Sequence, residues 1–171
     1  VALPIKNLKI FIDFKSLIKA TPNVEKLEVT FGAMNIQELK KLILRWKPSN
    51  IKRFTLNNVK NGQIQGEIIL NFENNYKIRG YRLNGKVKNI DIKIKDNIFI
   101  KNTEFNFFSH NDLFIANSIS ANFKKIPISK GSVEIDRNNG LSIDGNINTI
   151  VDFKNNDLKD FLSGISKFDL R

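Results

Sequence analysis

Residues 89–107 read NIDIKIKDNIFIKNTEFNF, and this stretch decides the fold. Isoleucine or phenylalanine recurs at every second position in three short runs, which are Ile90, Ile92 and Ile94, then Ile98 and Ile100, then Phe105 and Phe107. A period of two is typical of a β-strand with one apolar face, because successive side chains point to opposite sides of a sheet. Asp96 and Asn97 suit a tight turn. The stretch therefore predicts consecutive antiparallel strands.

The same alternation recurs along most of the chain. Its further apolar runs are Leu8, Ile10, Ile12 and Phe14; Leu27, Val29 and Phe31; Ile64, Ile68, Leu70 and Phe72; Leu113 and Ile115; Ile119, Ala121 and Phe123; Ile126 and Ile128; Val133 and Ile135; Leu141, Ile143 and Ile147; and Val151 and Phe153. Turn residues separate the runs, at Asn61-Gly62, Glu73-Asn74-Asn75, Asn84-Gly85, Asp96-Asn97, His110-Asn111-Asp112 and Arg137-Asn138-Asn139-Gly140. This pattern predicts a mainly β meander of about ten to twelve strands.

Two segments follow a helical period instead. A helix is predicted over about 35–46, where Asn35 and Glu38 form a capping-box pattern and Pro48 stops the helix. Its apolar stripe consists of Ile36, Leu39, Leu42, Ile43 and Trp46. A shorter stripe of Leu158, Phe161, Leu162 and Ile165 predicts a C-terminal helix over about 157–166. A helical turn is also possible at Ser16 to Lys19.

Composition restricts the class of protein. The 171 residues carry a net charge of +11 and contain no cysteine, so a disulfide framework and a thiolate metal site are excluded. A basic balance suits nucleic acid or an anionic membrane surface. However, Lys, Asn, Ile and Phe all have AT-rich codons, and base composition explains much of this usage. No apolar stretch approaches the ~18 residues of a membrane-spanning helix, and the N-terminus does not resemble a signal peptide.

The sequence carries no pattern that indicates catalysis. His110 is the single histidine and lies in a polar turn. The aspartates Asp91, Asp96, Asp136, Asp144 and Asp152 stand at strand edges or turns, where a solvated surface is the simpler interpretation. Phosphate-binding glycine loops, nucleophile elbows and HExxH are absent from the sequence. Most phenylalanines share the apolar parity and not that of the lysines, which disfavours stacking on nucleic acid. We expect no enzyme, no cofactor and no metal site.

Several segments together resemble the AsmA-like proteins, in particular the YhdP-type branch. A short helix ends in Leu42-Ile43-Leu44-Arg45-Trp46-Lys47-Pro48, and the basic segment 51–64, IKRFTLNNVKNGQI, leads into the next strand. Strand-and-small-turn units follow at 83–87 (LNGKV), 131–135 (GSVEI) and 141–147 (LSIDGNI). The resemblance covers most of the chain at the level of pattern. Lys47 between Trp46 and Pro48 departs from the Trp-Pro element of the family.

The resemblance implies a long, curved, groove-shaped antiparallel sheet with one or two short helices. It further implies that residues 1–171 are one periplasmic segment of a larger protein anchored in the inner membrane through parts outside this segment. Such proteins carry phospholipid toward the outer membrane, with acyl chains in the groove and head groups in water. The groove-lining residues are then Ile64, Ile68, Leu70, Phe72, Ile92, Ile94, Phe105, Phe107, Ile119, Phe123, Ile143 and Ile147. Trp46 and its helix cap or buttress one end.

The alternation leaves other readings open. A closed core and an open groove both place isoleucine and phenylalanine inward, so the pattern does not separate them. An alternative function is a β scaffold or assembly module in the envelope, which binds protein partners along a strand edge and no lipid. A third reading is a binder of nucleic acid or an anionic surface, which requires clustered cations and a steep salt dependence.

Overall fold

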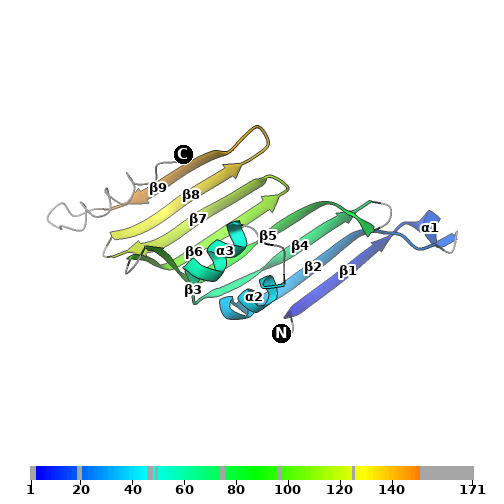
Figure 1. Ribbon diagram of the computed structural model, residues 1–171, viewed down its shortest axis with the longest axis horizontal. Helices are drawn as coiled ribbons and strands as arrows, with labels where there is room; N and C mark the ends of the chain where they lie inside the picture. The colour runs from blue at the N-terminus through cyan, green and yellow to red at the C-terminus, as the bar shows by residue number, and fades with distance from the viewer. Residues whose placement is uncertain are drawn as a thin grey trace.

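A computed structural model describes residues 3–18, 21–45, 48, 50–73, 76–95, 98–124 and 126–150. In these ranges the chain forms one antiparallel sheet with short helices (Figure 1). The strands are β1 (Ile5–Ile12), β2 (Val24–Asn35), β3 (Val59–Lys60), β4 (Gln63–Phe72), β5 (Ile78–Lys95), β6 (Ile98–His110), β7 (Leu113–Phe123), β8 (Ile126–Asp136) and β9 (Ser142–Thr149).

The strands follow one another across the sheet in the order β1-β2-β4-β5-β6-β7-β8-β9, and the two-residue β3 pairs with β5. The sheet is open, because β1 and β9 stand at its two ends and do not pair with each other. The prediction of a mainly β antiparallel meander with few short helices is confirmed. The described residues contain nine strands, fewer than the ten to twelve expected.

A line of β-bulges crosses the sheet and explains the smaller number of strands. Four neighbouring strands each hold one left-handed, non-glycine residue where the register shifts: Asn89 (φ 54°), Asn102 (φ 51°), Ser118 (φ 54°) and Lys130 (φ 54°). A bulge adds one residue, so the apolar parity changes while the apolar side chains stay on the same face. Runs of opposite parity that looked like separate strands are therefore continuous.

The strand β7 needs a second correction, because its two predicted runs have the same parity in the sequence but lie on opposite faces of the sheet. The runs Leu113/Ile115 and Ile119–Phe123 were interpreted as two strands, but they belong to one strand of 11 residues. The bulge at Ser118 places Phe114 and Ala116, not Leu113 and Ile115, on the face that Ile119 shares.

Asp91 of β5 forms hydrogen bonds at the bulge around Asn102 of β6. Its carboxylate accepts hydrogen bonds from the Asn102 backbone N–H (3.1 Å) and from Asn61 Nδ2 (2.9 Å).

The predicted turn at Asn84-Gly85 is also wrong. Both residues lie inside the 18-residue strand β5, where Gly85 pairs with Gly66 of β4. An ideal Cβ on Gly85 would stand 2.9 Å from the Gly66 Cα and 2.8 Å from the Phe107 ring. Because Gly85 has no side chain, the backbone of β4 and the Phe107 ring can both lie close to the backbone of β5. Besides marking turns, a glycine in a strand can mark such a close approach.

The helices are α1 (Phe14–Ile18), α2 (Ile36–Ile43) and α3 (Asn50–Asn58). The predicted capping box is present: Asn35 Oδ1 accepts from the Gln37 N–H (3.0 Å), and the Asn35 N–H donates to Glu38 Oε2 (3.3 Å). The helix ends at Ile43, before the predicted boundary, and Trp46 lies outside the described residues. The helix α3 was not predicted. The helical turn expected at Ser16–Lys19 begins earlier, at Phe14.

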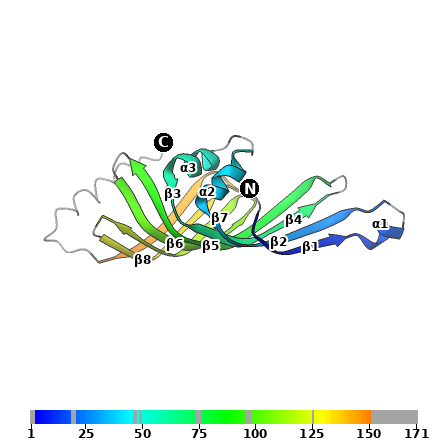
Figure 2. The ribbon, with the colours of Figure 1, turned by 90° about the horizontal axis from the view of Figure 1, so that it is seen from below.

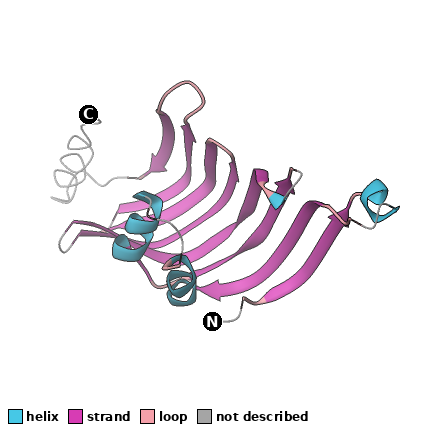
Figure 3. Ribbon diagram, turned by 45° about the vertical axis from the view of Figure 1, so that its right-hand side comes forward, coloured by secondary structure: helices cyan, strands magenta, loops and turns pink. Residues whose placement is uncertain are grey.

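Helices α2 and α3 lie together on one face of the sheet, and the sheet curves toward that side (Figures 2 and 3). Ile36 of α2 is buried in a core cluster with Val59, Val87, Ile90 and Phe107. A second, smaller cluster forms around Ala121, Phe123 and Ile128. The helices thus cover the centre of the sheet only. The predicted strand at Val151 and Phe153 and the helix over about 157–166 lie outside the described residues.

Candidate functional site

The register assembles a row of mainly apolar residues that runs across the sheet from edge to edge. Directly paired residues of antiparallel strands point to the same side. The pairing links the residues of this row in the order Leu8, Val29, Ile68, Leu83, Ser109, Phe114, Ile135 and Ile143. A parallel row consists of Ile5, Phe31, Gly66, Gly85, Phe107, Ala116, Val133 and Gly145. We call the side that carries these rows the apolar face.

The opposite side carries the intervening residues and is mixed and mostly polar. One row there consists of Lys9, Glu28, Ile69, Arg82, His110, Leu113, Asp136 and Ser142. Near the β1 edge, Lys26 Nζ contacts Glu28 at 2.9 Å and lies 4.0 Å from the centre of the Phe11 ring. We call this side the polar face. The two sides therefore differ in character across eight strands.

The apolar face is covered at its centre and open toward both edges of the sheet. Val87, Ile90 and Phe107 are buried where α2 packs on them. In contrast, Leu8 and Ile10 on β1 are 51% and 55% exposed, and at the other edge Ile143 and Ile147 are 43% and 49% exposed. Between centre and edge, side chains such as Val29, Ile68 and Leu83 are half-buried. Contiguous exposed apolar side chains are typical of surfaces that bind proteins, membranes or ligands.

The register places all twelve predicted lining residues on the apolar face, but with different exposure. Phe107 and Phe123 are buried in the two core clusters. Exposed side chains are those of Ile94, Ile143 and Ile147. Half-buried side chains are those of Ile64, Ile68, Leu70, Phe72, Ile92, Phe105 and Ile119. The predicted set thus mixes core residues beneath the helices with residues of the open surface.

Sequence reasoning missed further members of the open surface. Leu8, Ile10 and Val29 show the alternation but were not assigned to a lining. Leu83 and Phe114 were missed for a structural reason: Asn84-Gly85 was interpreted as a turn, and the parity of β7 was assigned without its bulge. Because neither signal can be read from period-two alternation alone, only the pairing register identifies these two residues.

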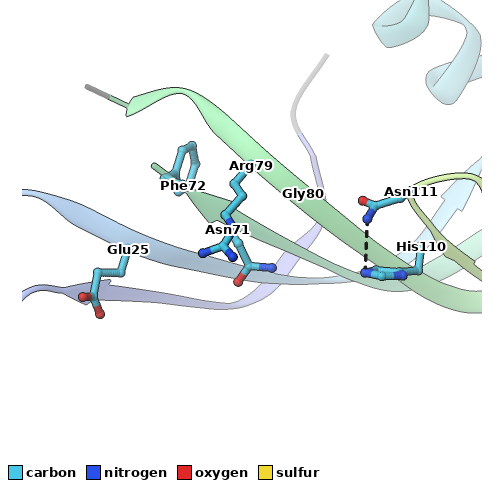
Figure 4. Close-up of a pocket in the computed structure, with 7 residues that line it drawn as sticks. All are labelled: Glu25, Asn71, Phe72, Arg79, Gly80, His110 and Asn111. Atoms are coloured by element: carbon cyan, nitrogen blue, oxygen red, sulfur yellow. Dashed lines mark hydrogen bonds between the residues drawn. The ribbon is translucent and has the colours of Figure 1, made fainter. Parts of the chain in front are cut away.

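Two depressions gather polar groups. One, of about 450 Å³, is lined by Glu25, Asn71, Phe72, Arg79, Gly80, His110 and Asn111. Figure 4 shows the Arg79 guanidinium, the Asn71 amide and the Glu25 carboxylate pointing to one side of the sheet, while the Phe72 ring points to the other. His110 contacts the Asn111 amide at 3.5 Å. The other depression, of about 720 Å³, has the side chains of Thr30, Glu67 and Asn84 among its lining.

Neither depression assembles a recognisable reaction centre. The side chains of Arg79, His110, Asn71 and Glu25 are all exposed. Among the described residues, no three carboxylate or histidine groups lie close enough to hold a metal ion. Thr103 Oγ1 is a buried polar atom that lacks a hydrogen-bond partner within that part of the chain, and it lies opposite Ile90 in the core.

None of the helices in the described ranges combines the length and apolar character that a membrane crossing requires. Comparison of the chain with protein-family models, with curated proteins and with solved structures finds no match.

Proposed function

We propose that this chain is a segment of an envelope protein that holds phospholipid acyl chains on its apolar face for transport between membranes, as its resemblance to the AsmA-like family implies. The observation that carries the proposal is the edge-to-edge apolar row from Leu8 to Ile143, which stays open on both sides of the helices. Complete burial of one exposed isoleucine or leucine side chain by a ligand contributes about 1.5–3 kcal/mol to the free energy of binding. A side chain that is already half-buried contributes roughly half of that value.

The dimensions of the row support an acyl chain as the occupant. Neighbouring strands lie about 4.8 Å apart, so eight strands span about 34 Å. One leaflet of a bilayer contains about 15 Å of hydrocarbon, half of the ~30 Å core. The apolar face is therefore longer than a single acyl chain. Binding there is non-directional and requires no catalytic group, because apolar contact depends on the area removed from water and not on the orientation of polar partners.

A scaffold function is the second candidate, and the edge strand β1 favours it. In the described part of the chain β1 pairs on one side only, with β2, and every residue of β1 is exposed. An edge with free backbone groups can accept a strand from a partner protein. This reading predicts a protein that binds no lipid when purified.

Lipid extraction followed by mass spectrometry on the purified protein tests the proposal. We expect roughly stoichiometric phospholipid in the wild type. The substitution Ile68→Asp places a charge on the apolar face, and we expect it to reduce the bound lipid severalfold, because a carboxylate costs several kcal/mol among acyl chains.

The neighbouring residue provides a matched control. Ile69 is also half-buried, but it pairs with Arg82 on the polar face. The variant Ile69→Asp should keep its phospholipid, and circular dichroism should show both variants folded. A folded wild type without phospholipid, or equal loss in the two variants, contradicts the acyl-chain proposal and favours the scaffold.

A further inference from the structure

The helical region that covers the centre of the sheet is strongly basic. Residues 36–60 contain seven cations, Lys40, Lys41, Arg45, Lys47, Lys52, Arg53 and Lys60, against the single acidic residue Glu38. Their net charge of +6 is more than half of the net charge of +11 of the whole chain. This concentration differs from the polar face, which carries carboxylates such as those of Glu28, Glu67 and Asp136 beside its lysines and arginines.

The exposed residues of α2, of the turn that follows it and of α3 include both cations and apolar groups. Lys41, Arg45 and Arg53 are exposed, and among the described residues they have no carboxylate within ion-pair distance. Leu44 and Phe54 are 59% and 48% exposed. We call these five residues the helix-pair surface.

Two lysines of the region serve the fold and bring the helices together. Lys52 Nζ donates to the Leu44 carbonyl at 2.8 Å, which joins the start of α3 to the end of α2. Lys40 Nζ donates to the Leu56 carbonyl at 2.8 Å. Burial lowers the pKa of Lys40, and the nearby positive charge of Lys60 lowers it further. These contacts place the C-terminal part of α2 beside α3, so the exposed cations of the two helices belong to one surface.

We propose that the helix-pair surface docks on an anionic phospholipid bilayer. The negative surface of such a bilayer attracts basic side chains, and each lysine or arginine near that surface contributes about 1 kcal/mol to the free energy of binding. Exposed leucine and phenylalanine side chains enter the interface between head groups and acyl chains. Nucleic acid fits the surface less well, because Phe54 is the single aromatic residue of these five, whereas single strands bind where successive bases stack on several aromatic side chains.

The inference goes beyond the proposed function and does not depend on it. The helix pair packs on the apolar face through Ile36 and Leu39, so a docked bilayer stands on the side where that face is open. Bound cargo is measured in the purified protein without vesicles, whereas docking is measured by adding vesicles. One property can therefore fail while the other holds.

Vesicle sedimentation tests the docking surface. Wild-type protein should bind vesicles of mixed phosphatidylglycerol and phosphatidylcholine, and binding should weaken as salt is added. Vesicles of phosphatidylcholine alone should bind far less. The triple variant Lys41→Gln, Arg45→Gln, Arg53→Gln should lose roughly 100-fold in apparent affinity for the anionic vesicles.

The matched control removes the same charge from the polar face, as Arg82→Gln, Lys88→Gln, Lys101→Gln, three residues that are also exposed. It should bind almost as the wild type does. A second variant, Leu44→Ser with Phe54→Ser, should weaken binding severalfold without any change in charge. Equal loss in the two triple variants overturns the proposal, since binding then follows net charge alone. Tighter binding of single-stranded RNA than of anionic vesicles at the same salt, lost in the first triple variant, also overturns it.

Discussion

Replacing Phe107 with alanine should lower the free energy of unfolding by about 3–5 kcal/mol. Phe107 is 6% exposed, shares a core cluster with Ile36 of α2, and its ring meets Phe105 edge-on at 6.4 Å between centroids. The alanine variant loses these contacts and leaves a cavity between the sheet and the helix. Urea unfolding followed by circular dichroism measures the change as a lower midpoint.

The adjacent Phe108 is the control for this prediction. It points to the polar face in a row with Asn84 and Ile115 and is half-buried. Phe108→Ala should cost clearly less than Phe107→Ala, because less area returns to water and no helix covers the ring. Equal losses in the two variants contradict the assignment of the core to the helix-covered side of the sheet.

Substitution of Gly85 by alanine should be the second strongly destabilising change, at about 3 kcal/mol or more. A Cβ there would collide with the Gln65 carbonyl oxygen and would stand 2.8 Å from the Phe107 ring. The backbone of β4 cannot yield without breaking its ladder with β5. Thermal unfolding should therefore show a large drop in the melting temperature.

Gly145 offers a matched comparison in the same cross-strand row. The nearest atom to a Cβ at Gly145 is the Ser132 carbonyl oxygen at 3.5 Å, which is an ordinary contact. Gly145→Ala should leave the melting temperature nearly unchanged or raise it slightly, because alanine reduces the conformational freedom of the unfolded chain. A Gly85→Ala variant as stable as Gly145→Ala would contradict the close pairing of Gly85 with Gly66.

The class of fold and much of its order followed from local sequence signals. Alternation predicted the strands, and the turn at Arg137–Gly140 was placed correctly. Asn61 (φ 53°) and Gly62 (φ 79°) do adopt left-handed conformations, but the predicted hairpin turn there is wrong, because β3 and β4 on either side both pair with β5 and not with each other. The capping box at Asn35 was also predictable, because its hydrogen bonds join residues no more than three positions apart.

The line of bulges was not predictable from alternation. Asparagine adopts positive φ readily, but serine and lysine rarely do, so the residue types at positions 118 and 130 give no sign of a bulge. Each bulge lies opposite a shift in the neighbouring strand, so its position depends on pairing between strands and not on one segment. The helix α3 was missed for a related reason, since Asn50–Asn58 has a weak apolar stripe and several β-branched or asparagine residues.

The side of the sheet that carries the candidate site was predictable, but its exposure was not. All twelve predicted residues lie on the apolar face, yet Phe107 is buried while Ile147 is half exposed. Ile and Phe satisfy a closed core and an open surface equally well. The difference depends on where α2 packs, and the core cluster formed there contains residues 36 and 107, which are distant in the sequence.

Position-specific crosslinking to phospholipid tests the central claim most directly. The chain contains no cysteine, so a single introduced cysteine can carry a photoreactive label. We expect labels at Leu8→Cys, Ile68→Cys and Ile143→Cys to crosslink phospholipid, and labels at the neighbours Lys9→Cys, Ile69→Cys and Asp144→Cys to yield little. Yield that alternates with the face of the sheet is the predicted result. Equal yield on both faces, or crosslinks to protein alone, would contradict an acyl-chain surface.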